Sequence, residues 1–245
     1  MRAFLRTFTL LWLIFIASVK GADVQSRPAL MVQGKSSLVN LLDIDSLMKR
    51  GQGTGMVFFS TVVGTNGDTR RYYTRVYGGS ANTELLTREI TGKIDRSIFH
   101  PALYHGTPQA AMVCGTVAYA VVEGKPHLRI YLNQEMEDLK KSNDFIAPQL
   151  LFLTGTQFQL HHPTLGQTAG IATVRMSVDE TGNVTGMKLE YESPKGKDFG
   201  GQLMMDLRKD AKFLPGYRNG KPVACSFTFP MIYKGITGSS QWKLD

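Results

Sequence analysis

The chain has 245 residues, of which 42% are hydrophobic and 20% are charged. This length is enough for two packed cores, at roughly 100–200 residues per domain. No long proline-rich or low-complexity tract interrupts the sequence.

Residues 1–21 are predicted to be a secretory signal peptide, because two arginines precede the apolar run 10–17 and small residues precede Ala22. Only 13 uncharged residues separate Arg6 from Lys20. A membrane-spanning helix needs about 20 apolar residues. We therefore expect cleavage and export, with an uncleaved membrane anchor as the alternative.

The basic excess of the chain is mild once this segment is removed. The formal net charge of +8 falls to +5, since residues 1–21 hold three of the 28 basic residues and none of the 20 acidic ones. The densest basic cluster, Arg70, Arg71 and Arg75, is interleaved with tyrosines and is predicted to be a solvated strand face. We expect no nucleic acid partner.

The first half is predicted to follow the order helix, strand, strand, helix, strand. Leucines at near-helical spacing predict a helix over Ser36–Arg50, which Gly51 ends. Asn66-Gly67 predicts a hairpin turn, because both residues can adopt positive φ. The expected strands are Met56–Val63, Thr69–Tyr77 and Ala110–Val122. The second helix is expected to start after an N-cap at Asn82. Its apolar stripe is Leu86, Ile90, Ile94 and Ile98.

The middle of the chain is less regular. The segment His127–Leu132 alternates after a tight turn at Glu123–Pro126, which predicts an added hairpin strand. This strand could cover the edge of the third strand. Residues 135–142 are a helix candidate, and Ile146–Leu153 is an apolar run that fits either a strand or a buried helix.

The second half repeats the order of the first. The expected strands are Ile171–Val178, Val184–Tyr191 and Cys225–Tyr233, with a helical stripe at Phe199, Leu203, Leu207 and Ala211. Gly55–Gly67 aligns without a gap on Gly170–Gly182, an offset of 115, and Phe99–Pro101 aligns on Phe213–Pro215, an offset of 114. A near-constant offset predicts a duplication.

The predicted class is therefore α+β, with two tandem β-β-α-β units. Each unit is expected to be a three-stranded antiparallel sheet with one helix packed on one face. The expected boundaries are 36–133 for the first repeat with its added strand, 134–164 for a linker and 165–235 for the second repeat.

The two cysteines, Cys114 and Cys225, are not equivalent in the repeat. Cys225 aligns with Ala111, and Ala111 and Cys114 would point to opposite faces of one strand. We interpret both as small core residues in preference to a disulfide.

The turn and core motifs resemble the C-terminal domain of TonB and its relatives, over about 50–125 and 165–235. The residues that carry the resemblance are Phe99–Ala102 and Gly106–Pro108 in the first copy and Val178–Val184, Phe213–Pro215, Asn219–Val223 and Phe227–Pro230 in the second. In that family a sheet edge takes up an extended peptide, the TonB box of an outer-membrane transporter. The physical basis is strand addition to unpaired backbone groups.

This resemblance implies a non-catalytic periplasmic interaction module. Its partner would be a peptide segment or an envelope protein, such as a TonB-dependent receptor, and an open edge also allows homodimers by strand pairing. The alternative is a membrane-anchored energy transducer, although the cleavable leader, the missing proline-rich spacer and the second domain depart from that pattern. The predicted peptide-binding edge is Ser226, Phe227, Thr228, Phe229, Pro230 and Met231. Pro230 suits either such an edge or a residue that blocks unwanted pairing.

No catalytic, cofactor or metal site is predicted. The five histidines do not cluster, and the pair His161-His162 is interpreted as a surface pair. Asp179 and Glu180 are assigned to a hairpin turn and not to an acid–base pair.

Overall fold

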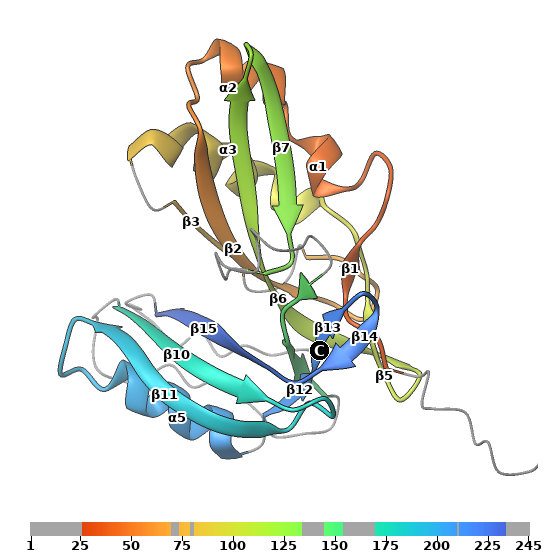
Figure 1. Ribbon diagram of the computed structural model, residues 1–245, viewed down its shortest axis with the longest axis vertical. Coiled ribbons are helices and arrows are strands. Elements are labelled where there is room, and N and C mark those ends of the chain that lie inside the picture. The colour runs from red at the N-terminus through yellow and green to blue at the C-terminus, as the bar shows by residue number, and fades with distance from the viewer. Residues whose placement is uncertain are drawn as a thin grey trace, which may run out of the picture.

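The structure is a computed structural model that describes residues 26–69, 74–78, 81–133, 145–153, 170–209 and 211–233. It is a mixed α+β fold in which the paired strands are antiparallel, as the sequence predicts (Figure 1). The predicted signal peptide, the helix candidate at 135–142, Arg70, Arg71 and His161-His162 lie outside the described residues.

In the first half, the central strand is β2 (Gly55–Val63), which pairs with β3 (Thr74–Gly78) and with β6 (Thr107–Val122). Between β3 and β6 the chain forms α3 (Glu84–Lys93), flanked by the short helices η1 (Ala81–Thr83) and η2 (Ile94–Arg96). The predicted apolar stripe of α3 is buried up to Ile94, whereas Ile98 is 41% exposed because the helical segment has already ended.

The second half has the same strand order. Its central strand is β10 (Gly170–Val178), which pairs with β11 (Val184–Ser193) and with β15 (Cys225–Tyr233). Helix α5 (Phe199–Lys209) follows β11 and packs against β10 and β11. It buries its predicted stripe residues Phe199, Leu203 and Leu207.

The first sheet is larger than the three strands expected. Four strands are added to these three, which makes seven. The strand β9 (Gln149–Phe152) pairs with β6 on one side and with β12 (Lys212–Leu214) on the other. The strands β5 (Ala102–Tyr104) and β7 (Lys125–Tyr131) each pair with β6. The apolar run at 146–153 is thus strand, and the predicted linker contains a strand that joins the two halves. Shorter strands complete the fold: β4 (Phe99–His100), β8 (Phe145–Ile146), β13 (Gly216–Arg218) and β14 (Lys221–Val223).

Two hydrophobic cores lie on opposite faces of this joining sheet. We call them the α3 core and the α5 core, after the helix that each contains. Successive strand residues point to opposite faces, so Leu150 lies in the α5 core and Leu151 in the α3 core. The α3 core also contains Leu214 from the second half, and the α5 core contains Met112 from the first. Neither half therefore has a core of its own.

The predicted helix over Ser36–Arg50 is two short helices, α1 (Leu38–Leu41) and α2 (Ile44–Lys49). The break occurs because the Asp43 side chain accepts a hydrogen bond from the Ser46 N–H at 2.9 Å and so caps a new helix. Before α1, the extended strand β1 (Leu30–Met31) pairs with β4.

The turn chemistry differs in one respect from expectation. At Asn66-Gly67 only Gly67 has positive φ. Two consecutive residues with positive φ occur instead at His105-Gly106, Glu123-Gly124 and Asn219-Gly220. Each of these pairs closes a tight hairpin, β5–β6, β6–β7 and β13–β14 respectively.

Candidate functional site

The candidate site is the edge strand β15. It pairs with β10 over its whole length, from Cys225 opposite Val178 to Tyr233 opposite Gly170, and the sheet order β11-β10-β15 leaves its other edge without a strand among the described residues. The corresponding strand of the first half, β6, is covered on that side. There β7 pairs with Thr116–Val122, and β9 pairs with Ala110–Met112.

Three of the six predicted edge residues are core residues. Phe227, Phe229 and Met231 are 2%, 1% and 4% exposed and lie in the α5 core. The two phenylalanines pack edge-on against each other and against Phe213, with ring centroids 6.0 to 6.3 Å apart. Their side chains are therefore turned away from any partner, and recognition along β15 would have to use the backbone.

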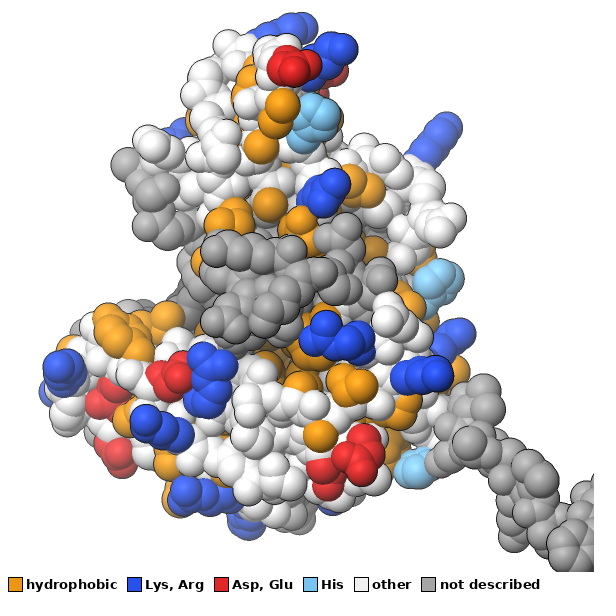
Figure 2. Space-filling model, viewed as in Figure 1, with side chains coloured by type: hydrophobic (Ala, Val, Ile, Leu, Met, Phe, Trp, Pro, Cys, Tyr) orange, Lys and Arg blue, Asp and Glu red, His pale blue; other side chains and the backbone are white. Residues whose placement is uncertain are grey.

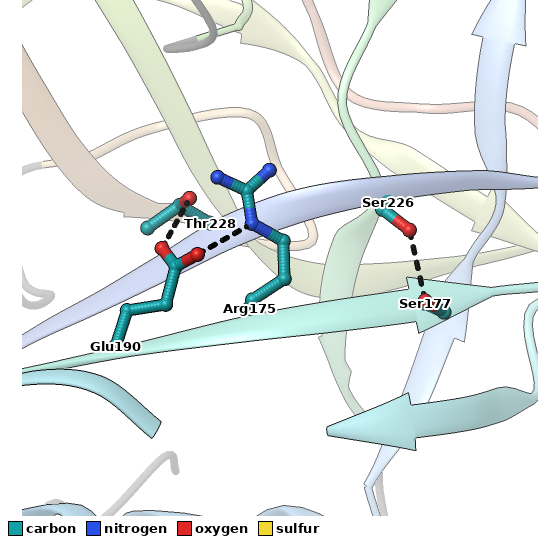
Figure 3. A network of polar contacts seen from close by, with 5 residues as sticks. All are labelled: Arg175, Ser177, Glu190, Ser226 and Thr228. Atoms are coloured by element: carbon teal, nitrogen blue, oxygen red, sulfur yellow. Dashed lines mark hydrogen bonds and ion pairs between the residues drawn. The ribbon is translucent and has the colours of Figure 1, made fainter. Parts of the chain in front are cut away.

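The other three edge residues alternate with these. Ser226 is exposed, Thr228 is half-buried, and Pro230 is buried opposite Thr173 of β10. Ser226 shares a hydrogen bond of 2.8 Å with the Ser177 hydroxyl, which ties the polar face of β15 to that of β10 (Figure 3).

Glu190 is the centre of a polar network on this face (Figure 3). Its carboxylate accepts a hydrogen bond from Arg175 Nε at 2.9 Å and one from Thr228 Oγ1 at 3.3 Å. The network thus links all three strands of the sheet. The Arg175 hydrogen bond is the main reason that the pKa of Glu190 lies below its ordinary value.

A β-bulge accounts for the position of Glu190. Val174 pairs with Leu189 and Thr173 with Tyr191, so Glu190 is the additional residue on β11. A bulge of this kind redirects a side chain and bends the strand. It also disrupts the outer edge of β11, which makes β15 the more regular of the two edges of this sheet.

The structure places both cysteines as predicted. Cys114 is buried in the α5 core, Cys225 packs partly buried against it, and no disulfide joins them. Burial raises the pKa of the Cys114 thiol to about 11, and the neighbouring Ser60 hydroxyl opposes this shift only in part. Cys114 is therefore a thiol, and not the reactive thiolate, near neutral pH.

Two buried glutamines were not identified from the sequence. The Gln52 side chain donates to the Asn82 carbonyl at 2.6 Å and accepts from the Leu86 N–H at 2.9 Å, so it caps α3 from outside the helix. The N-cap residue itself is Thr83, and not Asn82 as predicted.

The Gln149 amide binds the backbone N–H and carbonyl of Ala29, at 2.7 and 2.9 Å. The position of Gln149 as the one amide side chain inside the apolar run 146–153 was the sequence signal for this residue.

Over the described ranges, no group of three or more His, Cys, Asp and Glu residues could hold a metal ion. The same part of the chain contains no helix that is long and apolar enough to span a membrane.

Acidic and basic side chains are interspersed on the lower half of the molecule in the view of Figure 2.

No family model, curated protein or solved structure matches this chain.

Proposed function

We propose that the chain is an exported, non-catalytic binding module, built from two copies of a unit that resembles the C-terminal domain of TonB. In this proposal the second copy takes up an extended peptide by strand addition along the outer edge of β15. The observation that carries the proposal is the difference between β6, whose outer edge is covered by β7 and β9, and β15, whose outer edge has no described strand.

Matching backbone hydrogen bonds support the duplication. The Gly67 N–H donates to Gly64 at 2.9 Å, and the Gly182 N–H donates to Asp179 at 3.0 Å. Both pairs of residues are 115 positions apart. In both turns a Cβ on the glycine would lie 2.0 Å from a phenylalanine carbonyl oxygen, that of Phe99 in the first and that of Phe213 in the second.

The strand registers extend the proposed repeat beyond the predicted boundaries. Phe99, His100 and Leu103 pair with Met31, Leu30 and Arg27, whereas Phe213, Leu214 and Tyr217 pair with Leu150, Gln149 and Ile146. Phe99, His100 and Leu103 each precede their counterparts in the second half by 114 positions. The pairing partners of these residues each precede theirs by 119 positions. We therefore infer that each copy begins with a leading strand, near residues 26 and 145.

Pro230 defines which backbone groups of β15 face outward. Proline has no N–H, so it fits best where the nitrogen points away from the neighbouring strand. Because the direction alternates along a strand, the N–H of Ser226 has the same outward direction as the nitrogen of Pro230. A peptide on this edge would thus bind donors on either side of a gap at Pro230, and the gap would help to set its register.

The proposed ligand is an extended segment of an envelope protein, of the kind that an outer-membrane transporter presents. Main-chain hydrogen bonds would supply the affinity for this segment. The polar face around Glu190 would select among its side chains.

The test compares Ser226→Pro with Ser226→Ala. Both variants lack the hydroxyl that bonds Ser177, but only the proline variant lacks the outward N–H. A random-peptide library would be selected on the wild type, and the enriched peptides titrated into isotope-labelled protein. We expect amide shifts concentrated on β15, similar binding by Ser226→Ala and at least about tenfold weaker binding by Ser226→Pro.

Equal binding by the two variants, or shifts located away from β15, would contradict the proposed edge. Size-exclusion chromatography of the wild type is run alongside. Dimers that dissociate in Ser226→Pro but not in Ser226→Ala would identify a second copy as the strand that pairs with β15.

A further inference from the structure

The N-terminal segment Ser26–Val32, which we call the arm, is bound to the rest of the protein as an extended peptide. One edge of the arm pairs with β4 and β5. Arg27 exchanges two backbone hydrogen bonds with Leu103, at 3.0 and 2.9 Å, Leu30 and Met31 pair with β4, and the Val32 N–H donates to Ile98 at 3.3 Å.

The other edge of the arm is held by side chains. The Gln149 amide binds both backbone groups of Ala29, and the Tyr217 hydroxyl donates to the Ser26 carbonyl at 3.2 Å. A side-chain amide that pairs with a main-chain N–H and C=O replaces a neighbouring strand without adding one. The arm is thus held by hydrogen bonds to its backbone on both edges, which is the way a protein binds an extended peptide.

The slot also imposes a side-chain requirement. Ala29 is fully buried and Pro28 is buried, whereas Gln33, Gly34 and Lys35 are exposed. A larger residue in place of Ala29 would have to displace core atoms. The slot therefore suits an extended segment with a small residue at this position.

The corresponding segment of the second half is fixed far more firmly. Residues 149–152 pair with β12 on one edge and with β6 on the other. Among the described residues, the arm has a strand on one edge only, and it ends in an exposed turn at Gln33–Lys35. Of the two segments, the arm is the one that can leave without breaking the joining sheet.

We propose that the slot between β4–β5 and the Gln149 amide is a second peptide-binding site, which the chain's own arm occupies and an extended segment with a small residue in the Ala29 position can replace. This site is separate from β15 and does not depend on the function proposed for that edge.

The test uses the full chain with a specific protease site inserted between Gln33 and Gly34. The probe is a synthetic peptide of residues 26–35 with a fluorophore on Lys35, and uptake is followed by fluorescence anisotropy. We expect saturable uptake by the cut protein and at least about tenfold less by the uncut protein. An Ala29→Leu peptide should bind at least about tenfold more weakly, and a Gln33→Ala peptide should bind as well as the wild-type peptide.

Three results would overturn the proposal. They are no uptake by cut protein that keeps its circular dichroism spectrum, equal uptake of the Ala29→Leu peptide, and loss of the native spectrum on cutting. The last result would mean that the arm is a permanent strand of the fold.

Hydrogen exchange on the intact, uncut chain provides an independent measurement. An arm that opens locally should exchange the amides of Arg27, Ala29 and Val32 at least about 100-fold faster than those of Leu150 and Leu151. Equal protection of the two segments would show that the arm leaves only when the whole protein unfolds, and would refute the exchange.

Discussion

The turn at Gly182 has no room for a Cβ atom. The φ of this glycine is +87°, and an added Cβ would lie 2.0 Å from the Phe213 carbonyl oxygen. The turn therefore excludes a side chain both through its backbone conformation and through the close approach of the chain that follows α5.

We expect Gly182→Ala to lower the free energy of unfolding by about 2–4 kcal/mol, from the left-handed conformation and the overlap together. The matched control is Gly53→Ala, since Gly53 has no positive φ and no atom within 4 Å of the added Cβ. It should change stability by less than about 0.5 kcal/mol. Urea unfolding measures both, and an equal loss in the two variants would contradict this account.

The Asp179 carboxylate organises the same turn. The Thr181 hydroxyl and then the Asn183 N–H, which donate to it at 2.7 and 2.9 Å, are the largest causes that lower its pKa from 3.8 to about 2. A depressed pKa contributes stability that is present above the unfolded value and is lost as the pH falls through the folded value. The contribution of Asp179 should thus disappear between pH 4 and pH 2.

A carboxyl-carbon NMR titration should give a midpoint near 2 for Asp179. Thr181→Ala should move this midpoint upward, whereas Thr185→Ala, whose hydroxyl bonds Ser177 instead, should leave it in place. A Thr181→Ala midpoint identical to that of the wild type would exclude the hydroxyl as the main cause.

At the scale of elements, helix α3 depends on a residue that precedes it by more than 30 positions. Gln52 is 4% exposed and bonds both the Asn82 carbonyl and the Leu86 N–H. Replacement by leucine would leave the buried Leu86 N–H and the partly buried Asn82 carbonyl without these partners. We expect Gln52→Leu to cost about 1–3 kcal/mol of unfolding free energy, and exposed Gln33→Leu less than about 0.5 kcal/mol, in thermal melts. Equal melting temperatures would argue against the cap.

The elements also show what the sequence could and could not predict. The alternation of β10 and the stripe of α5 are local patterns, and the α+β class that they indicate is confirmed. Ser36–Arg50 was wrongly predicted as one helix, since the leucine spacing does not reveal that Asp43 starts a second. Phe227 and Phe229 were assigned to a binding edge although the same alternation buries them. The roles of Gln52 and Gln149 depend on partners 34 and 120 residues away, so no local pattern contains them.

At the scale of the whole molecule, the two cores should unfold together. Leu150 and Leu151 are adjacent on β9, are 0% and 1% exposed, and point into the α5 and α3 cores respectively. Truncating either leucine removes packing from one face of the joining sheet and so weakens the sheet that both cores share.

We expect Leu150→Ala and Leu151→Ala each to cost about 2–5 kcal/mol and to shift one common transition. Far-ultraviolet circular dichroism and aromatic fluorescence should give coincident curves in both variants. Two separate transitions, with a different one shifted in each variant, would mean that the halves are independent domains.

The hydrogen bond between the Tyr217 hydroxyl and the Ser26 carbonyl spans 191 residues of sequence. A ribosome makes the arm before it makes β13, so the slot of the arm is incomplete until β13 has also been made. Complete docking of the arm must therefore wait until Tyr217 has been made. Contacts of such sequence separation slow folding, so the arm should be among the last segments to dock.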